Sequence, residues 1–196
     1  MNLLEAKHGF IIGVGGSGKS DFVRNLIKDN PQKCIYISIH NEDFGNIPCI
    51  TIKEPSSEVK NLEVSKIPQY ITNNESFVIK IASGYVGQML ASEYLNDVVL
   101  EILKFNKNFT LVIDDAIFIA GQFRETYKKL LTQKEFSVVS IFQNINPEIK
   151  YIFDYAEQIY LFKLSPTDFE SFEEKGLLSK DDLKVFDQKV GEFIVR

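Results

Sequence analysis

Long hydrophobic runs, cysteine and arginine are all scarce in this sequence of 196 residues. No apolar run approaches the ~20 residues that a membrane-spanning helix needs, and the N-terminal stretch is too short and too charged for a secretory signal. The cysteines, Cys34 and Cys49, fall in strand-like runs, which predicts two buried thiols in a reducing compartment and leaves too few thiols for a zinc site. Arginine occurs only as Arg24, Arg124 and Arg196. Because kinases of small molecules surround the transferred phosphate with several arginines, this scarcity disfavours their chemistry.

The chain is acidic, but its charge is unevenly distributed. Its formal net charge is -5 at pH 7 and its pI is about 5.2. A monomer of this charge lacks the basic face that non-specific binding to nucleic acid requires. Residues 124–134, however, hold one arginine and three lysines against one glutamate, so a local basic patch on an acidic body stays open.

Short β-branched or aromatic runs alternate along the chain with segments of helical periodicity. Strands are expected at residues 9–14, 34–39, 49–52, 77–82, 109–116, 136–144, 157–164 and 191–195. Helices are expected at 20–29, within 59–71, at 88–103, 118–131 and 181–186, and after Ser165 and Pro166, which fit an N-cap and a first helical residue. We therefore expect a single domain over residues 1–196 with an α/β fold. Its central sheet should be mostly parallel with helices on both faces, and the last strand or two could pair antiparallel at an edge.

The strongest motif is GVGGSGKS at residues 13–20, a full match to the phosphate-binding pattern G-x-x-x-x-G-K-[ST] between a strand and a helix. Glycines let backbone N–H groups wrap a phosphate, and the following helix adds the positive end of its dipole. Lys19 should reach the β- and γ-phosphates, and Ser20 should bind Mg²⁺ through its hydroxyl. The residues expected to bind the nucleotide are Gly13, Gly15, Gly16, Ser17, Gly18, Lys19, Ser20 and Asp21.

A second motif is the hydrophobic strand LVIDD, which ends in Asp114 and Asp115. Downstream of a phosphate loop, such a strand typically holds Mg²⁺, so Asp114 is expected to bind the metal, usually through water. Asp115 is expected to polarise the attacking water as a general base. A kinase that must exclude water has no need of such a carboxylate, so the pair favours hydrolysis. An ordinary acid pair at the end of a strand remains the alternative.

The next strand ends in Gln143, and Arg124 lies in the helix between the two strands. Ligands of parallel sheets bind at the carboxyl ends of the strands, so Gln143 should point toward the γ-phosphate and sense it or orient the water. A solvated glutamine in a turn is the alternative. Arg124 is the first candidate for an arginine finger supplied by a neighbouring subunit, and a plain surface arginine is its alternative.

In this order, the three motifs resemble those of the FtsK/HerA superfamily of DNA-pumping ATPases. Within it, the chain resembles the small genome-packaging ATPases of DNA viruses with an internal membrane, including archaeal viruses. The resemblance extends to FQNINPEIKYIFDYAEQIYLFKL at residues 142–164, to SPTDFESFEEKGLLSKDDLKVF at residues 165–186 and to the closing GEFIV.

This resemblance implies a RecA- or FtsK/HerA-like fold and an enzyme that hydrolyses ATP with Mg²⁺ to move double-stranded DNA into a capsid. It also implies a pentameric or hexameric ring, in the cytoplasm or at a capsid vertex, that meets capsid or membrane proteins. A ring would concentrate weak basic loops around one channel, which reconciles the acidic pI with DNA handling. The family often has Glu where this chain has Asp115, and it tends to place an arginine just before the strand of Gln143. That arginine is missing here, so Arg124, Lys134 and Lys150 all stay candidates for the finger.

Two other functions remain open from the sequence. One is a nucleotide-dependent assembly ATPase, as in phage morphogenesis, which would act on protein rather than on DNA. The other is a small-molecule kinase, which the scarcity of arginine disfavours.

Overall fold

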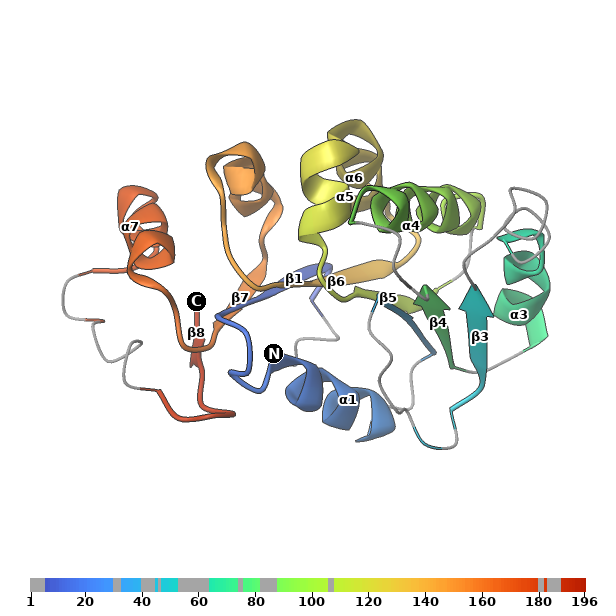
Figure 1. Ribbon diagram of the computed structural model, residues 1–196, viewed down its shortest axis with the longest axis horizontal. Coiled ribbons are helices and arrows are strands. Elements are labelled where there is room, and N and C mark those ends of the chain that lie inside the picture. Colours follow the sequence, from blue (N-terminus) through green and yellow to red (C-terminus); the bar gives the residue numbers. More distant parts are fainter. Residues whose placement is uncertain are drawn as a thin grey trace.

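A sheet of eight strands runs through the middle of the molecule (Figure 1). The computed structural model describes residues 6–29, 33–39, 45, 47–52, 64–73, 76–81, 88–105, 108–179, 182 and 188–196. The strand order is β3-β4-β2-β5-β6-β1-β7-β8. Neighbouring strands are parallel except for β7 and β8, which pair antiparallel at one edge. The predicted fold class and the antiparallel edge pairing are thus confirmed.

The helices and strands alternate along the chain as the sequence predicts. The strands are β1 (His8–Ile12), β2 (Cys34–Ser38), β3 (Cys49–Ile52), β4 (Phe77–Ile81), β5 (Thr110–Ile113), β6 (Ser137–Phe142), β7 (Gln158–Leu161) and β8 (Ile194–Val195). The helices are α1 (Lys19–Asp29), α3 (Ile67–Asn73), α4 (Gln88–Ile102), α5 (Ile117–Gln122), α6 (Arg124–Leu131), the 3-10 helix η2 (Pro147–Tyr155) and α7 (Pro166–Glu174).

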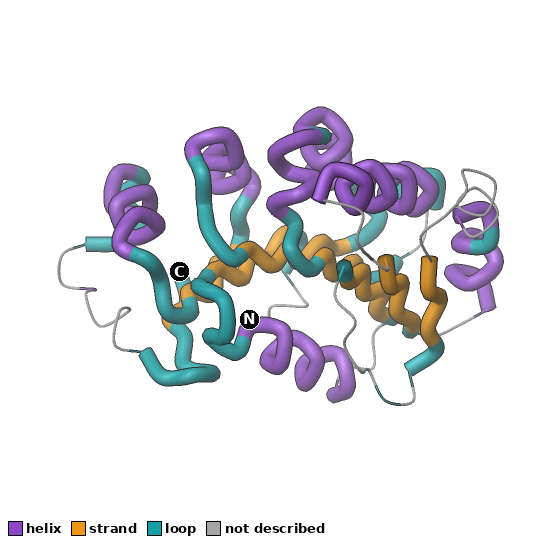
Figure 2. Tube along the Cα trace, viewed as in Figure 1, coloured by secondary structure: helices purple, strands orange, loops and turns teal. Residues whose placement is uncertain are grey.

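Helices lie on both faces of the sheet, which forms the middle layer (Figure 2). Helix α1 packs on one face, and α4, α5, α6 and α7 lie on the other (Figure 1). Successive strand residues point to opposite faces, so Ile11 and Tyr36 join the cluster under α1, whereas Phe10 and Ile37 join the larger cluster on the other face. The central strands β1 and β2 are buried along their whole length, as near-continuous apolar runs predict.

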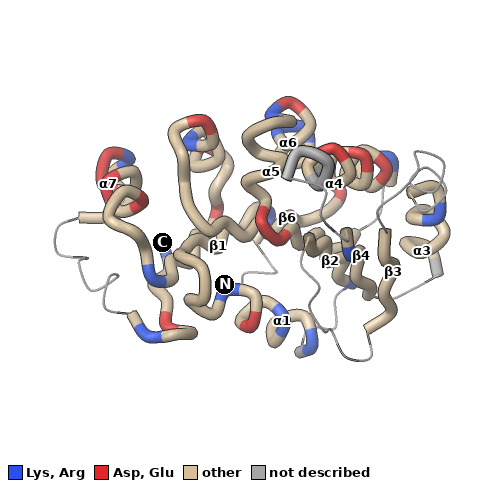
Figure 3. The backbone as a smooth tube through the Cα atoms, in the orientation of Figure 1, with Lys and Arg blue, Asp and Glu red and all other residues tan. Residues whose placement is uncertain are grey.

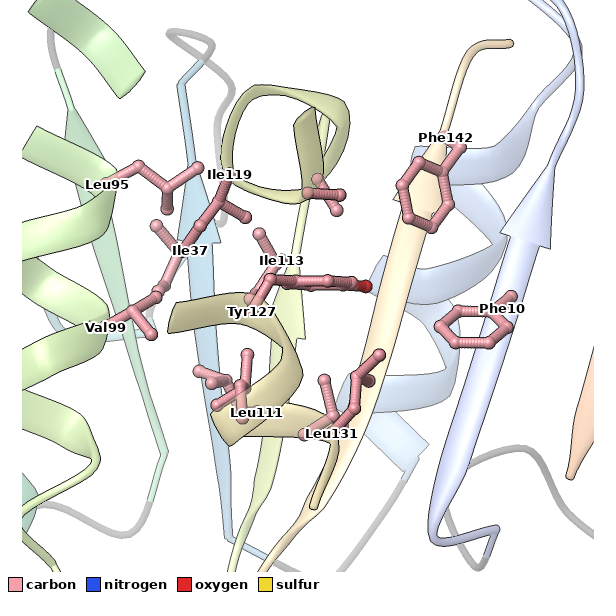
Figure 4. Close-up of a cluster of buried hydrophobic side chains, with 14 of the residues drawn as sticks. Phe10, Ile37, Leu95, Val99, Leu111, Ile113, Ile119, Tyr127, Leu131 and Phe142 are labelled. Carbon is pink, nitrogen blue, oxygen red and sulfur yellow. The ribbon is translucent and has the colours of Figure 1, made fainter. Parts of the chain in front are cut away.

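The larger cluster fills the space between the sheet and helices α4, α5 and α6 (Figure 4). Tyr127 of α6 lies in this layer with no exposed surface, and its hydroxyl lies 2.6 Å from the Ser140 hydroxyl on β6. A buried phenol needs such a partner, because an unpaired polar group in a core is costly. The other residues labelled in Figure 4 are Phe10, Ile37, Leu95, Val99, Leu111, Ile113, Ile119, Leu131 and Phe142.

Two sequence-based expectations were wrong. The single helix expected at residues 118–131 is divided into α5 and α6 at Phe123, whose φ of -118° and ψ of 48° leave the helical region. Gly121, a poor helix former, lies just before this break. Cys34 is buried but Cys49 is exposed, because β3 is an edge strand whose residues alternate between exposed and buried.

Other expectations concern the C-terminal third. Ser165 is the N-cap of α7, since its side chain accepts a hydrogen bond from the Asp168 N–H, and Pro166 begins the helix. Apart from Asp182, the helix expected at 181–186 lies outside the described residues. Several acidic residues lie on α4 and on α7 (Figure 3). Among the helices that the structure describes, none has the length and apolarity to cross a membrane.

Candidate active site

The glycine-rich segment between β1 and α1, residues 13–18, forms a loop that is held from both sides. The N–H of Gly13 donates to the Phe142 carbonyl (3.2 Å), and the N–H of Val14 donates to the Lys163 carbonyl (2.8 Å). Because β1 lies between β6 and β7, these bonds tie the loop to the last residue of β6 and to the segment that follows β7. At Gly18 the backbone has a φ of +94°, which glycine adopts without the steric cost that other residues incur.

Lys19 begins α1 and turns its ammonium group back into the loop. Its side chain nitrogen donates to the carbonyls of Gly13 (2.7 Å) and Val14 (2.9 Å), and the residue is 6% exposed. Burial lowers the pKa of Lys19, and the nearby carboxylates of Asp114 and Asp115 partly oppose this effect. The ammonium thus lies at the floor of the loop, where a phosphate group can replace its carbonyl partners.

Asp114 is the most strongly held carboxylate of the site. It directly follows β5, is 2% exposed and receives a hydrogen bond of 2.8 Å from the Tyr36 hydroxyl on β2. The Ser20 hydroxyl lies 3.4 Å from the same carboxylate oxygen, Oδ2, and the Asp115 N–H donates to the other oxygen at 3.0 Å. A hydroxyl and a carboxylate at this separation, beside a phosphate loop, are oxygen ligands of the kind that Mg²⁺ prefers. The residues present therefore fit the expected metal.

Asp115 and Gln143 are joined by their side chains. The Gln143 amide donates to both carboxylate oxygens of Asp115, at 2.8 and 3.0 Å. Asp115 is 4% exposed and has a φ of +49°, the only positive φ among the described residues other than glycine. Strained backbone of this kind often marks functional positions. The strand order explains the contact, because β6, which delivers Gln143, lies between β5 and β1.

Residues of the loop and of α1, together with Asp114, Asp115 and Gln143, line a cavity of about 330 Å³. The structure thus brings most of the predicted nucleotide-binding, metal-binding and water-activating residues around one cavity, and their roles stay predictions. Gly13 and Ser17 belong to the same loop but do not line the cavity. Arg24, Val190 and Tyr36 were missed. Arg24 lies one helical turn after Ser20 and pairs with Asp21. This helical spacing could have predicted that Arg24 lies on the same side of α1 as Ser20. The cavity is lined by Gly15, Gly16, Gly18, Lys19, Ser20, Asp21, Arg24, Asp114, Asp115, Gln143 and Val190.

The three candidates for the finger lie apart from this cavity. Arg124 is exposed at the start of α6, and its guanidinium carbon lies 4.3 Å from the centre of the Tyr151 ring. Lys150 pairs with Glu174 at 2.5 Å, and Lys134 is exposed after α6. None of the three is among the described residues that line the cavity, so none completes the site of its own chain.

A second cavity, of about 720 Å³, adjoins the first at Asp115 and Gln143. It opens between α5 and the segment after β6, and Gln122, Asn144 and Glu148 are among its polar lining residues. Asp115 and Gln143 are thus approachable from this side by a group from outside the chain.

No protein-family profile matches the sequence, and no curated protein matches it. Solved structures, in contrast, match its fold. The genome packaging NTPase B204 from Sulfolobus turreted icosahedral virus 2, in complex with AMPPCP, is 16% identical with a TM-score of 0.64, over 100% of this chain and 93% of that one. VirB4 of Thermoanaerobacter pseudethanolicus is 12% identical with a TM-score of 0.68, over 96% of this chain and 86% of that one. At these identities the likeness concerns the fold, and the chain has the fold of a P-loop ATPase, as the sequence predicts.

Proposed function

We propose that this chain is a Mg²⁺-dependent ATPase that works as a ring and moves double-stranded DNA into a viral capsid. The observation that carries the hydrolytic part is the bidentate contact of the Gln143 amide with Asp115 at the mouth of the phosphate loop. It combines a carboxylate that can take a proton from water with an amide that can orient that water or sense the γ-phosphate.

The binding step follows from the loop. The backbone N–H groups of residues 13–18 would hold the phosphates, and the Lys19 ammonium would exchange its carbonyl partners for phosphate oxygens. Ser20 and Asp114 would hold Mg²⁺, which supplies charge neutralisation of the phosphates when bound. Tyr36 and the Asp115 N–H keep the Asp114 carboxylate oriented toward this position.

The hydrolytic step belongs to Asp115 and Gln143. Asp115 would accept the proton of a water that lies in line with the γ-phosphate. The Gln143 amide, now on the carboxylate, would turn partly toward the water and the phosphate. Arg24, on the α1 side of the same cavity, adds a positive charge near the phosphates.

The ring is supported by the position of Arg124, which does not lie among the described residues that line the cavity of its own chain. A finger stabilises the charge that develops on the transferred phosphate. The second cavity reaches Asp115 and Gln143 from outside, and Asp115 and Glu148 give it acidic groups that would attract a cation from a neighbouring copy. Exposed Arg124 and Lys129 also give α6 a basic surface on a chain of net charge -5. The coupling to DNA is inferred from the fold shared with structures described as genome packaging NTPases.

The test measures ATP turnover with and without duplex DNA, together with the mass of the particle in the presence of AMPPCP. We expect turnover that DNA stimulates, a ring when nucleotide is bound, and no turnover after Lys19→Ala. Gln143→Ala should lower kcat by roughly 100-fold or more with little change in nucleotide affinity, whereas the control Gln133→Ala, at the end of α6, should resemble wild type. Turnover that DNA does not stimulate, from a particle that never oligomerises, would contradict DNA translocation and favour the assembly ATPase.

The finger is tested by mixing variants. Subunits with Lys19→Ala keep a finger but have no working nucleotide site, and subunits with Arg124→Ala keep the site but lack the finger. If Arg124 acts across the subunit boundary, a mixture of the two inactive variants regains part of the activity. If Arg124→Ala is active alone, Arg124 is not the finger, and the same mixing experiment is repeated with Lys134→Ala and Lys150→Ala.

A further inference from the structure

A third cavity, of about 520 Å³, lies beside the phosphate loop and has no role in the chemistry described above. Loop residues 14–17 form one of its walls, and Lys163, Gln188, Lys189 and Val190 form the rest. It shares Gly15, Gly16 and Val190 with the cavity that would hold the phosphates. The two cavities therefore adjoin at these shared residues, and an elongated ligand on the loop would extend from one toward the other.

The wall opposite the loop comes from the segment 188–193, which is fastened to the site. The Gly191 N–H donates to the Ser17 carbonyl at 3.0 Å. Phe193 packs on Phe22 of α1 and Tyr160 of β7, with ring centroids 4.8 and 5.1 Å apart. These contacts hold the segment against the loop while leaving Val190 74% exposed between the two cavities. An exposed valine at this point offers an apolar surface to a ligand that spans them.

Gln188 supplies an uncharged polar group to this wall. Its side-chain oxygen Oε1 is buried, and within the described part of the chain it has no hydrogen-bond partner. A buried acceptor without a partner is unfavourable. Because the terminal torsion of glutamine is soft, the amide can reorient when a ligand occupies the cavity that this residue lines.

We propose that this third cavity binds the nucleoside half of the nucleotide and that Gln188 reads its base as adenine. A glutamine amide can accept from the exocyclic amino group of adenine and donate to the ring nitrogen N7, whereas guanine presents two acceptors on that edge and cannot make the same pair. Val190 packs against the ribose or the base, and Lys163 and Lys189 flank the sugar and the α-phosphate. This inference rests on the proposed function, because it assumes a nucleoside triphosphate held by the loop through Lys19.

The experiment compares the binding of AMPPCP, GMPPCP and inorganic tripolyphosphate, each with Mg²⁺, by calorimetry. The variants are Gln188→Leu, which keeps the size of the side chain but removes the amide, and Gln133→Leu as the matched control outside all three cavities. Tripolyphosphate has no base, so its binding reports on the phosphate loop alone and shows that the variant is folded.

We expect wild type and Gln133→Leu to bind AMPPCP at least about tenfold more tightly than GMPPCP, the discrimination of one bidentate amide–adenine pair. Gln188→Leu should lose this preference while its affinity for tripolyphosphate stays that of wild type. Equal binding of AMPPCP and GMPPCP by wild type, or a preference that survives Gln188→Leu, overturns the inference and leaves the proposed function standing. If wild type binds none of the three probes, both fail together.

Discussion

Replacing Tyr36 by phenylalanine tests how Asp114, the carboxylate that we propose binds Mg²⁺, is held in place. The ring of Tyr36 is 1% exposed in the cluster under α1, and its hydroxyl donates to Asp114 at 2.8 Å. Phenylalanine keeps the ring and its packing, so the change removes one hydrogen bond to a charged, buried acceptor. Such bonds contribute about 1.5–3 kcal/mol. For a domain of this size, a loss of about 2 kcal/mol lowers the melting temperature by about 4–8 °C.

Tyr127→Phe is the matched control, because it removes an equally buried hydroxyl from a neutral partner. The Tyr127 hydroxyl lies 2.6 Å from that of Ser140, and both residues have no exposed surface. A neutral pair contributes about 1 kcal/mol, so Tyr127→Phe should lower the melting temperature about half as much as Tyr36→Phe. The assay is thermal unfolding without nucleotide, followed by a Mg²⁺ titration of ATP turnover.

Only Tyr36→Phe should raise the Mg²⁺ concentration needed for half-maximal turnover, since only that hydroxyl orients Asp114. If Tyr36→Phe destabilises the fold no more than Tyr127→Phe and leaves the Mg²⁺ requirement unchanged, the carboxylate does not depend on this donor. Tyr36 would then not be the group that positions Asp114 for Mg²⁺.

Three further changes test other parts of the structure. Gly18→Ala should abolish detectable nucleotide binding in a calorimetric titration, because its Cβ would lie 2.8 Å from the Gly191 nitrogen at a φ of +94°, and survival of binding would argue against this loop geometry. A thiol reagent should label Cys49 rapidly in the native protein but Cys34 only after unfolding. Cys34 is buried, and burial raises its pKa to about 11. Rapid labelling of both thiols in the native state would refute this. Burial lowers the pKa of His8, so the unfolded chain takes up a proton first and stability is lost as pH falls through the ordinary histidine pKa of about 6.5. In urea unfolding, His8→Gln should therefore lose less free energy of unfolding than wild type between about pH 7.5 and 5.5, and equal losses would exclude His8 as a cause.

The parts of the site that were predictable from the sequence are those that a local pattern specifies. Lys19 and Ser20 follow a glycine-rich loop between a strand and a helix, and Asp114 follows a run of buried apolar residues. Gln143 could be placed at the same edge because the carboxyl ends of parallel strands meet there. What the sequence leaves open is the neighbour of each strand, and only the order β5-β6-β1 explains why Gln143 contacts Asp115.

The features that were missed depend on contacts between distant segments. Nothing in the run around Tyr36 distinguishes a hydroxyl that reaches Asp114 from a tyrosine that merely packs. The break at Phe123 goes against a helical pattern that continues across it, so tertiary packing overrides local preference there. Cys49 is exposed because β3 is an edge strand, and the sequence of a strand does not say which strands will be neighbours.

The order of the strands also explains why the two ends of a nucleotide would be read by different segments of this chain. The loop after β1 has β6 on one side and β7 on the other. The β6 side delivers Gln143 to the phosphate end, and the β7 side supports the segment that carries Gln188. Asp168, at the start of α7, is 1% exposed and accepts a hydrogen bond of 2.7 Å from the Ile145 N–H, so the segment after β6 is tied to the segment after β7. A motif search therefore finds the loop, because the loop is continuous in sequence. The segments that carry Gln143 and Gln188 come to lie beside the loop only when the sheet forms.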